Sequence, residues 1–306
     1  MRILLLLLLV VTCYAAMRPP NVKNPAGMPK LHDMTTSAGE SSAANNEHHQ
    51  KLIEKFPGAM PASAFRSRVE TMLKARGLDG GNTLLSTSFC CDEVNRSFER
   101  LLSDSLGGHS FNLGGLSGFP FAGSVGIGAM ASHIPTGGHA VVIYGPHVGF
   151  STADYAAGAV ERSGIAAPNG CCGSAIAAMN SITAEHEESQ RPGWFKRNPP
   201  LPPIIDMQQN HVQEQIKGQF DPEVGLSHDS LPSVAFSAIT PDVDYLLGTG
   251  SDDETHKLEG KASTLVVIGG ILVNTAPGME DYFVPMRFEL FDEGGKLKTN
   301  LLGEML

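Results

Sequence analysis

The sequence has few basic residues and lacks several common catalytic motifs, and each shortage excludes a class of protein. Its 306 residues hold 22 lysines and arginines against 32 aspartates and glutamates, a formal net charge of -10 at pH 7. Nonspecific binding to nucleic acid or anionic lipid needs clustered positive charge, so no nucleic-acid partner is expected. The Gly-Lys-Ser/Thr phosphate loop, the Gly-x-Ser-x-Gly elbow and the His-Glu-x-x-His helix are missing. These absences argue against a P-loop nucleotidase, an α/β-hydrolase and a zincin protease.

Long apolar runs are also lacking beyond the N-terminus. Residues 3–12 form an apolar run after Arg2, and small residues follow it. That run is too short to span a bilayer comfortably, so residues 1–16 are predicted to be a signal peptide, whose cleavage removes Cys13. The longest later apolar run, residues 265–273, contains two glycines and has the length of a strand. No membrane insertion is therefore expected after signal cleavage.

The rest of the chain is predicted to form one domain behind a flexible leader. Residues 17–59 are mostly rich in Pro, Ser, Asn and Gly without a sustained hydrophobic period, so we expect a flexible leader or targeting segment there. Residues 60–306 carry enough apolar material for a single core that needs no disulfides.

Hydrophobic spacing in residues 60–306 predicts helices alternating with strands. Helical spacing is expected at 63–76, 92–106 and 174–187, and strand patterns at 82–90, 140–144, 264–273 and 282–291. This order predicts an α/β fold, with site residues at the ends of strands.

Cysteine is scarce, and its placement is informative. Once Cys13 is removed, two pairs remain, Cys90-Cys91 and Cys171-Cys172, and they flank a Gly-Pro-His segment that ends in His147. Zinc prefers thiolate and imidazole ligands, and a catalytic zinc uses three protein ligands plus one exchangeable position. One cysteine from each pair together with His147 would supply those three ligands. The sequence therefore predicts a zinc site.

An acidic and a basic residue follow the first cysteine pair. Asp92 lies two residues after Cys90, and Arg96 lies four residues after Asp92, which would place the two on one helical face. An aspartate held by an arginine beside a metal could orient a bound water. The simpler interpretation is an exposed helix ion pair, worth a few tenths of a kcal/mol.

Disulfides are the alternative interpretation of the two cysteine pairs. In a secreted chain four cysteines commonly form two disulfides, with three pairings to choose from. A mixed arrangement, with one cysteine of each pair on zinc and the others bonded or free, is also open. The isolated histidine at a strand end, the Cys-x-Asp-x-x-x-Arg grouping and the large core favour metal.

Four segments, taken in order, resemble one known family. They are Cys-Cys-Asp-Glu-Val-Asn-Arg at 90–96, the glycine- and phenylalanine-rich stretch at 111–123, Gly-Pro-His-Val-Gly at 145–149, and Cys-Gly at 172–173. This set resembles the limiting-CO2-inducible protein B family, which includes the theta-type carbonic anhydrases of algae. The resemblance implies a β-carbonic-anhydrase-like sheet flanked by helices, and a homodimer.

The resemblance also implies a ligand set and a reaction. It implies zinc held by Cys90, His147 and Cys172, with Asp92 and Arg96 as a catalytic dyad. The implied lyase reaction is the reversible hydration of CO2 to bicarbonate by a zinc-bound hydroxide, in which Asp92 accepts a hydrogen bond and Arg96 keeps it ionised. The alternative is a non-catalytic zinc-bearing subunit of an inorganic-carbon concentrating complex. The signal peptide leads into the secretory pathway, whose end would be the cell exterior or, in algae with secondary plastids, the plastid.

Overall fold

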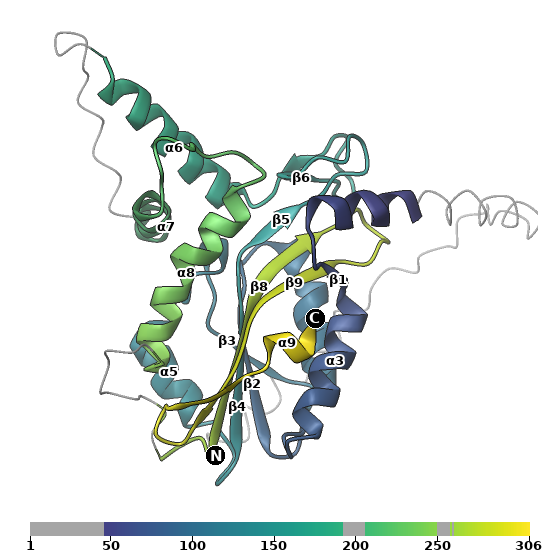
Figure 1. Ribbon diagram of the computed structural model, residues 1–306, viewed down its shortest axis with the longest axis vertical. Helices are drawn as coiled ribbons and strands as arrows, with labels where there is room; N and C mark the ends of the chain where they lie inside the picture. Colours follow the sequence, from purple (N-terminus) through teal and green to yellow (C-terminus); the bar gives the residue numbers. More distant parts are fainter. Residues whose placement is uncertain (1–45, 192–205, 250–257, 259) are drawn as a thin grey trace, which may run out of the picture. The chain divides into compact units, whose positions relative to one another are not determined.

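The computed structural model describes residues 46–191, 206–249, 258 and 260–306 (Figure 1). Residues Asn45–Leu306 form one compact unit. The predicted signal peptide and most of the predicted leader lie outside the described residues. Within the described residues, no helix combines the length and the apolar composition needed to cross a membrane.

A sheet of eight strands runs through the unit. Its order is β1-β9-β8-β4-β2-β3, with β10 paired to β9 and β5 paired to β8. Strands β3, β2, β4 and β8 are mutually parallel, whereas β9 is antiparallel to β8. The bounds are β1 Met60–Pro61, β2 Thr83–Ser88, β3 Ser110–Asn112, β4 His139–Tyr144, β5 His147–Gly149, β8 Thr264–Asn274, β9 Tyr282–Asp292 and β10 Leu297–Asn300. A separate small ladder pairs β6 Ala159–Val160 with β7 Asn169–Gly170.

Helices cover both faces of this sheet (Figure 1). One face carries α5 Gly123–Ala131, α6 Gly173–Ser189, α7 Met207–Gly218 and α8 Leu231–Leu247, and the other carries α3 Ala62–Lys74, α4 Arg96–Ser105 and α9 Leu302–Met305. Short 3-10 turns lie at η1 Glu93–Asn95 and η2 Leu116–Gly118. The predicted α/β class, with a central sheet flanked by helices, is confirmed.

Strand β4 shows why its segment folds between two layers. Side chains alternate across a strand, so an all-apolar run faces two cores at once. Val142 and Tyr144 pack into the core under α8, whereas Val141 and Ile143 pack into the core under α3 and α4. Burial on both faces therefore holds β4 at the centre of the sheet. The candidate site lies at the ends of these central strands.

A break between β4 and β5 carries the chain towards this site. Both strands pair in parallel with β8, with Tyr144 opposite Gly269 and His147 opposite Leu272. Gly145, at the break, has a φ of 157°, and a Cβ there would collide with the carbonyl oxygen of Gly270. Glycine is therefore required for this close approach. The break thus places His147 at the end of the sheet.

The compact unit begins earlier than the predicted boundary at residue 60. Residues 46–55 are helical, and Leu52 and Phe56 are buried in the core beneath α8. The predicted leader over 17–59 is therefore wrong at its C-terminal end. Apolar burial by this short helix outweighs the polar composition of the surrounding sequence.

Candidate metal centre

Three segments of the chain converge at the carboxyl ends of the central strands. Cys90 follows β2 by two residues, His147 is the first residue of β5, and Cys172 is the N-cap residue of α6. Parallel strands end at the same edge of a sheet, which is where sites form in such folds. One donor atom from each of the three lies within 4.8 Å of the others, and all three residues are buried. The structure therefore contains a buried Cys-His-Cys cluster that could hold a metal ion.

The two sulfurs of this cluster lie within hydrogen-bonding distance of each other. Cys90 Sγ lies 3.8 Å from Cys172 Sγ, and the hydroxyl of Ser117 lies 3.5 Å from Cys172 Sγ. The hydrogen bond with the Cys90 thiol lowers the pKa of Cys172, and the same contact, together with burial, raises the pKa of Cys90. Two thiolates at this separation repel, so full ionisation of the pair needs a cation between them.

The imidazole of His147 is held from one side only. Its Nδ1 lies 2.8 Å from Oδ1 of Asn274, while its Nε2 is buried and has no hydrogen-bond partner among the described residues. Burial by itself lowers the pKa of His147, but the negative charge of Cys172 and Cys171 outweighs burial and raises it. A buried nitrogen without a partner is costly unless something binds it. Nε2 is therefore free to bind a metal ion.

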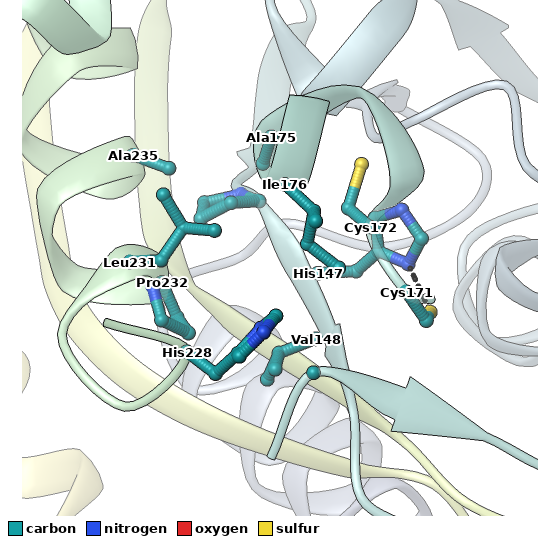
Figure 2. A pocket seen from close by; sticks show the side chains of 12 residues that line it. His147, Val148, Cys171, Cys172, Ala175, Ile176, His228, Leu231, Pro232 and Ala235 are labelled. Atoms are coloured by element: carbon teal, nitrogen blue, oxygen red, sulfur yellow. Dashed lines mark hydrogen bonds between the residues drawn. The ribbon is translucent and has the colours of Figure 1, made fainter. Parts of the chain in front are cut away.

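The other two cysteines occupy different positions. Cys171 is fully buried, with its Sγ 3.4 Å from His147 Nδ1, and Figure 2 shows it below the imidazole ring while Cys172 lies above. Cys91 is exposed. All four described cysteines are free, so the disulfide interpretation finds no support. Cys171 also forms a second group with His147 and Asp92, whose donor atoms lie within 4.8 Å of one another.

Asp92 is paired with an arginine that the sequence did not single out. Arg162 Nη1 lies 2.8 Å from Asp92 Oδ1, and Nη2 lies 2.9 Å from Oδ2, a two-pronged pair. Arg162 also contacts Glu93. Burial disfavours the charged carboxylate, but the hydrogen bonds from Arg162 outweigh burial and hold the pKa of Asp92 well below its usual value. Asp92 is thus ionised beside the cluster.

The predicted pairing of Asp92 with Arg96 is wrong in its geometry. Asp92 is not part of a helix: its φ and ψ of -56° and 136° are extended, and its side chain accepts a hydrogen bond from the Val94 amide. The four-residue spacing rule therefore does not apply to it. Arg96 begins α4 and instead pairs with Glu99 at 2.5 Å.

Arg96 nevertheless contacts the site through the main chain. Its guanidinium donates to the carbonyl oxygen of Cys90, and Asn95 Nδ2 donates to the same oxygen at 3.1 Å. Arg96 thus supports the backbone of a candidate ligand rather than a carboxylate. The catalytic roles of Asp92 and Arg96 stay predictions.

A small apolar cavity of about 10 Å³ adjoins His147 and Cys172. That is close to the smallest space that holds one water molecule. Figure 2 shows the side chains around it, which come mainly from β5, α6 and α8: Val148, Ala175, Ile176, Leu231, Pro232 and Ala235, with His228 at one side. Phe119, Pro120 and Phe121, from the glycine- and phenylalanine-rich stretch, line a separate groove beside α7 and α8.

A polar groove of about 530 Å³ lies on the Arg162 side of the cluster. Its lining includes Glu93, Arg162 and Asp281. Burial raises the pKa of Asp281, although its carboxylate accepts hydrogen bonds from the Thr275 amide at 3.0 Å and the Ser97 hydroxyl at 3.2 Å. The cluster thus has an apolar side and a polar side.

Fold and cluster together define a class: an α/β protein with a buried Cys-His-Cys group at the ends of parallel strands. The comparisons with known proteins narrow that class. The family described as limiting CO2-inducible proteins B/C beta carbonic anhydrases matches residues 59–292. The chain belongs to this family. No curated protein sequence matches it.

Solved structures that are similar to this chain include the following three. PtLCIB4, a homolog of the limiting CO2-inducible protein LCIB, is 33% identical over 82% of this chain and 98% of its own, with a TM-score of 0.69. A histidine-to-alanine point mutant of PtLCIB4 is 32% identical over 83% and 98%, with a TM-score of 0.70. LCIB itself is 26% identical over 82% and 97%, with a TM-score of 0.59.

The family resemblance implied the cluster of Cys90, His147 and Cys172, but two further residues were not predicted: Asn274, which contacts His147, and Arg162, which pairs with Asp92. Arg162 lies in a loop without hydrophobic period, so no pattern could assign it. Asn274 is one residue beyond the predicted strand 264–273, and its position at the end of β8 beside β5 was the available signal.

Proposed function

We propose that the protein is a zinc-dependent carbonic anhydrase, which catalyses the reversible hydration of CO2 to bicarbonate. One observation carries the proposal: two thiols and an unpartnered imidazole nitrogen converge, buried, in a chain of this family. The substrates would be CO2 and bicarbonate.

The donor set fits zinc. Thiolate sulfur and imidazole nitrogen are its preferred ligands, and three protein ligands leave one exchangeable position. Cys90 and Cys172 would hold the ion as thiolates, and His147 through Nε2, the buried nitrogen without a partner. When bound, zinc lowers the pKa of a coordinated water so that a nucleophile for CO2 exists near neutral pH.

Residues other than the proposed zinc ligands would orient the water and bind CO2. Arg162 keeps Asp92 ionised, and a carboxylate oxygen of Asp92 lies within 4.8 Å of a His147 ring nitrogen. Asp92 would therefore accept a hydrogen bond at the site and orient the attacking water. The apolar side chains of Val148 and Ile176 would favour CO2 over water beside the cluster.

Zinc content and CO2 hydration should be measured on one purified sample. We expect about one zinc per chain and oxygen-isotope exchange between CO2 and water above the uncatalysed rate. Cys172→Ser should lose both, and Cys91→Ser, at an exposed position, should lose neither. Protein without zinc and without exchange after metal loading would refute the proposal.

One observation favours the alternative, a non-catalytic zinc-bearing subunit of a carbon-concentrating complex. The cavity beside His147 and Cys172 is about 10 Å³, so CO2 would need side chains to move. Stoichiometric zinc without isotope exchange would support this alternative.

Assembly is proposed on the resemblance, and location on the predicted signal peptide. The protein is proposed to be a homodimer, which light scattering at several concentrations would test. The secretory route, ending outside the cell or in a plastid, rests on residues 1–16. A fluorescent protein fused after the full chain, compared with one fused to a chain lacking those residues, would test it.

A further inference from the structure

Asn274 joins the candidate ligand His147 to a second hydrogen-bonded residue. It is the last residue of β8, and β5 runs parallel beside it, with Gly149 opposite Asn274 in the ladder. Its main-chain oxygen accepts a hydrogen bond from the Phe150 amide at 2.9 Å. The residue is 1% exposed, so its side-chain amide must find partners inside the protein.

The two ends of the Asn274 side-chain amide face different kinds of group: hydrogen-bond donors near Oδ1 and acceptors near Nδ2. Oδ1 lies 2.8 Å from His147 Nδ1 and 3.7 Å from Cys171 Sγ, both of which can donate a proton. Nδ2 points towards the Val94 carbonyl oxygen, at 3.5 Å, and the Asn274 side chain also interacts favourably with the nearby Asp281 carboxylate, whose pKa it lowers. Donors near Oδ1 and acceptors near Nδ2 determine which way the amide lies.

We propose that Asn274 is the positioning residue that holds His147 in the tautomer with the proton on Nδ1, so that Nε2 presents its lone pair to the metal. A neutral imidazole carries one proton, and the acceptor at 2.8 Å places it on Nδ1. The orphaned, buried Nε2 is then the ligand atom. Asp281 lies on the other side of Asn274 from His147 and would hold the Nδ2 end of the amide. This inference rests on the proposed zinc site and extends it to residues outside the ligand set.

Metal affinity, measured by chelator competition, tests the inference separately from catalysis. Asn274→Leu keeps the size of the side chain and removes the acceptor, and it should weaken Zn²⁺ binding roughly 10- to 100-fold. The exchange variant Asn274→Asp with Asp281→Asn keeps an acceptor for His147 and a donor behind it, and it should recover most of the affinity.

Asn82→Leu is the matched control. Asn82 also makes side-chain hydrogen bonds to the main chain, to Gly77 and Asp79, but it precedes β2, at the opposite end from Cys90. It should lower stability without changing zinc affinity. Equal zinc affinity in folded Asn274→Leu and wild type would overturn the inference, as would failure of the exchange variant to improve on Asn274→Leu.

A spectroscopic measurement on the wild type removes any dependence on how the variants fold. In ¹⁵N-histidine-labelled, zinc-loaded protein, the His147 resonances should show a protonated Nδ1 and a metal-bound Nε2. A metal-bound Nδ1 would overturn the inference while leaving the proposed function intact. Wild-type protein that binds no zinc would instead refute the proposed function and, with it, this inference.

Discussion

Arg162 and Asp92 meet through two parallel hydrogen bonds of 2.8 and 2.9 Å, although 70 residues of chain separate them. Both side chains are about 15% exposed, so water screens the pair only partly. The pair closes the polar side of the Cys-His-Cys cluster. Arg162, which comes from a different segment, thus makes the ion pair with Asp92 that was expected of Arg96.

Arg162→Leu is predicted to lower CO2 hydration by roughly 10- to 100-fold while zinc stays bound, because Asp92 loses the partner that keeps it ionised and oriented. Arg76→Leu, which breaks a pair with Glu304 on the far side of the sheet, is the control and should retain full activity. Isotope exchange and zinc content on the three proteins make the comparison. Full activity in Arg162→Leu would contradict the assignment.

Arg96→Leu is predicted to act mainly on stability. It leaves the nearly buried Glu99 without its charged partner, which should cost about 1–3 kcal/mol of unfolding free energy. Thr87 still donates a hydrogen bond to Glu99 at 3.0 Å, which limits the loss. Urea unfolding provides the measurement. An unchanged unfolding free energy together with abolished activity would return the dyad role to Arg96.

Asp92→Asn is predicted to retain zinc and to lose most of its turnover. The amide keeps the shape of the carboxylate but removes the negative charge that Arg162 stabilises. Zinc content and isotope exchange, measured together, separate this outcome from loss of metal. If the variant loses zinc, Asp92 is a ligand, as its grouping with His147 and Cys171 also allows.

Thiol counting tests the free state of the cysteines. Denatured, chelated protein without its signal peptide should react with a thiol reagent at four positions, and native protein rapidly at Cys91 alone, because the other three are buried. No reductant is added. Two or fewer reactive thiols after denaturation would show that disulfides form and would revive that interpretation.

The pH dependence of stability should carry a signature of Asp281. Burial raises its folded-state pKa above the unfolded value, so its contribution to stability is fully present below the unfolded pKa of about 3.9 and is lost as pH rises through the folded pKa. The unfolding free energy of wild type minus that of Asp281→Asn should therefore fall as pH rises.

Urea unfolding of metal-free wild type and Asp281→Asn at about pH 4 and about pH 8 measures this difference. Asp92 has the opposite shift, but it is present in both proteins and cancels. Asp292→Asn, at the end of β9 where the carboxylate accepts a hydrogen bond from the Gly294 amide, is the control. A difference that stays constant or grows with pH would contradict the assignment.

The sheet could be predicted largely because its central strands are continuous apolar runs. The expected strands at 140–144, 264–273 and 282–291 agree with β4, β8 and β9 to within about one residue, as boundaries set by burial should. Helix α8 had no such signal, since it contains Pro241 and is buried over much of its surface. A helix without an amphipathic stripe leaves no period to detect.

The candidate site, like the fold, could be predicted from the sequence only in part. One cysteine of each pair and His147 could be selected because thiol and imidazole are scarce in this sequence, and the family resemblance then implied Cys90 and Cys172. The partner of Asp92 could not be selected, because Asp92 has an extended conformation before η1 and lies outside α4, and the loop carrying Arg162 approaches it through tertiary contacts alone. Local spacing predicts neighbours only inside regular elements.

The convergence of β2, β5 and α6 on one point has a thermodynamic consequence. An ion bound by Cys90, His147 and Cys172 would tie three separate stretches of chain together, as a removable cross-link. The folded state would then be stabilised in proportion to the logarithm of free metal, by about 2.7 kcal/mol at a hundred times the dissociation constant. Zinc supply would thus set how much folded protein persists, in addition to how much of it is active.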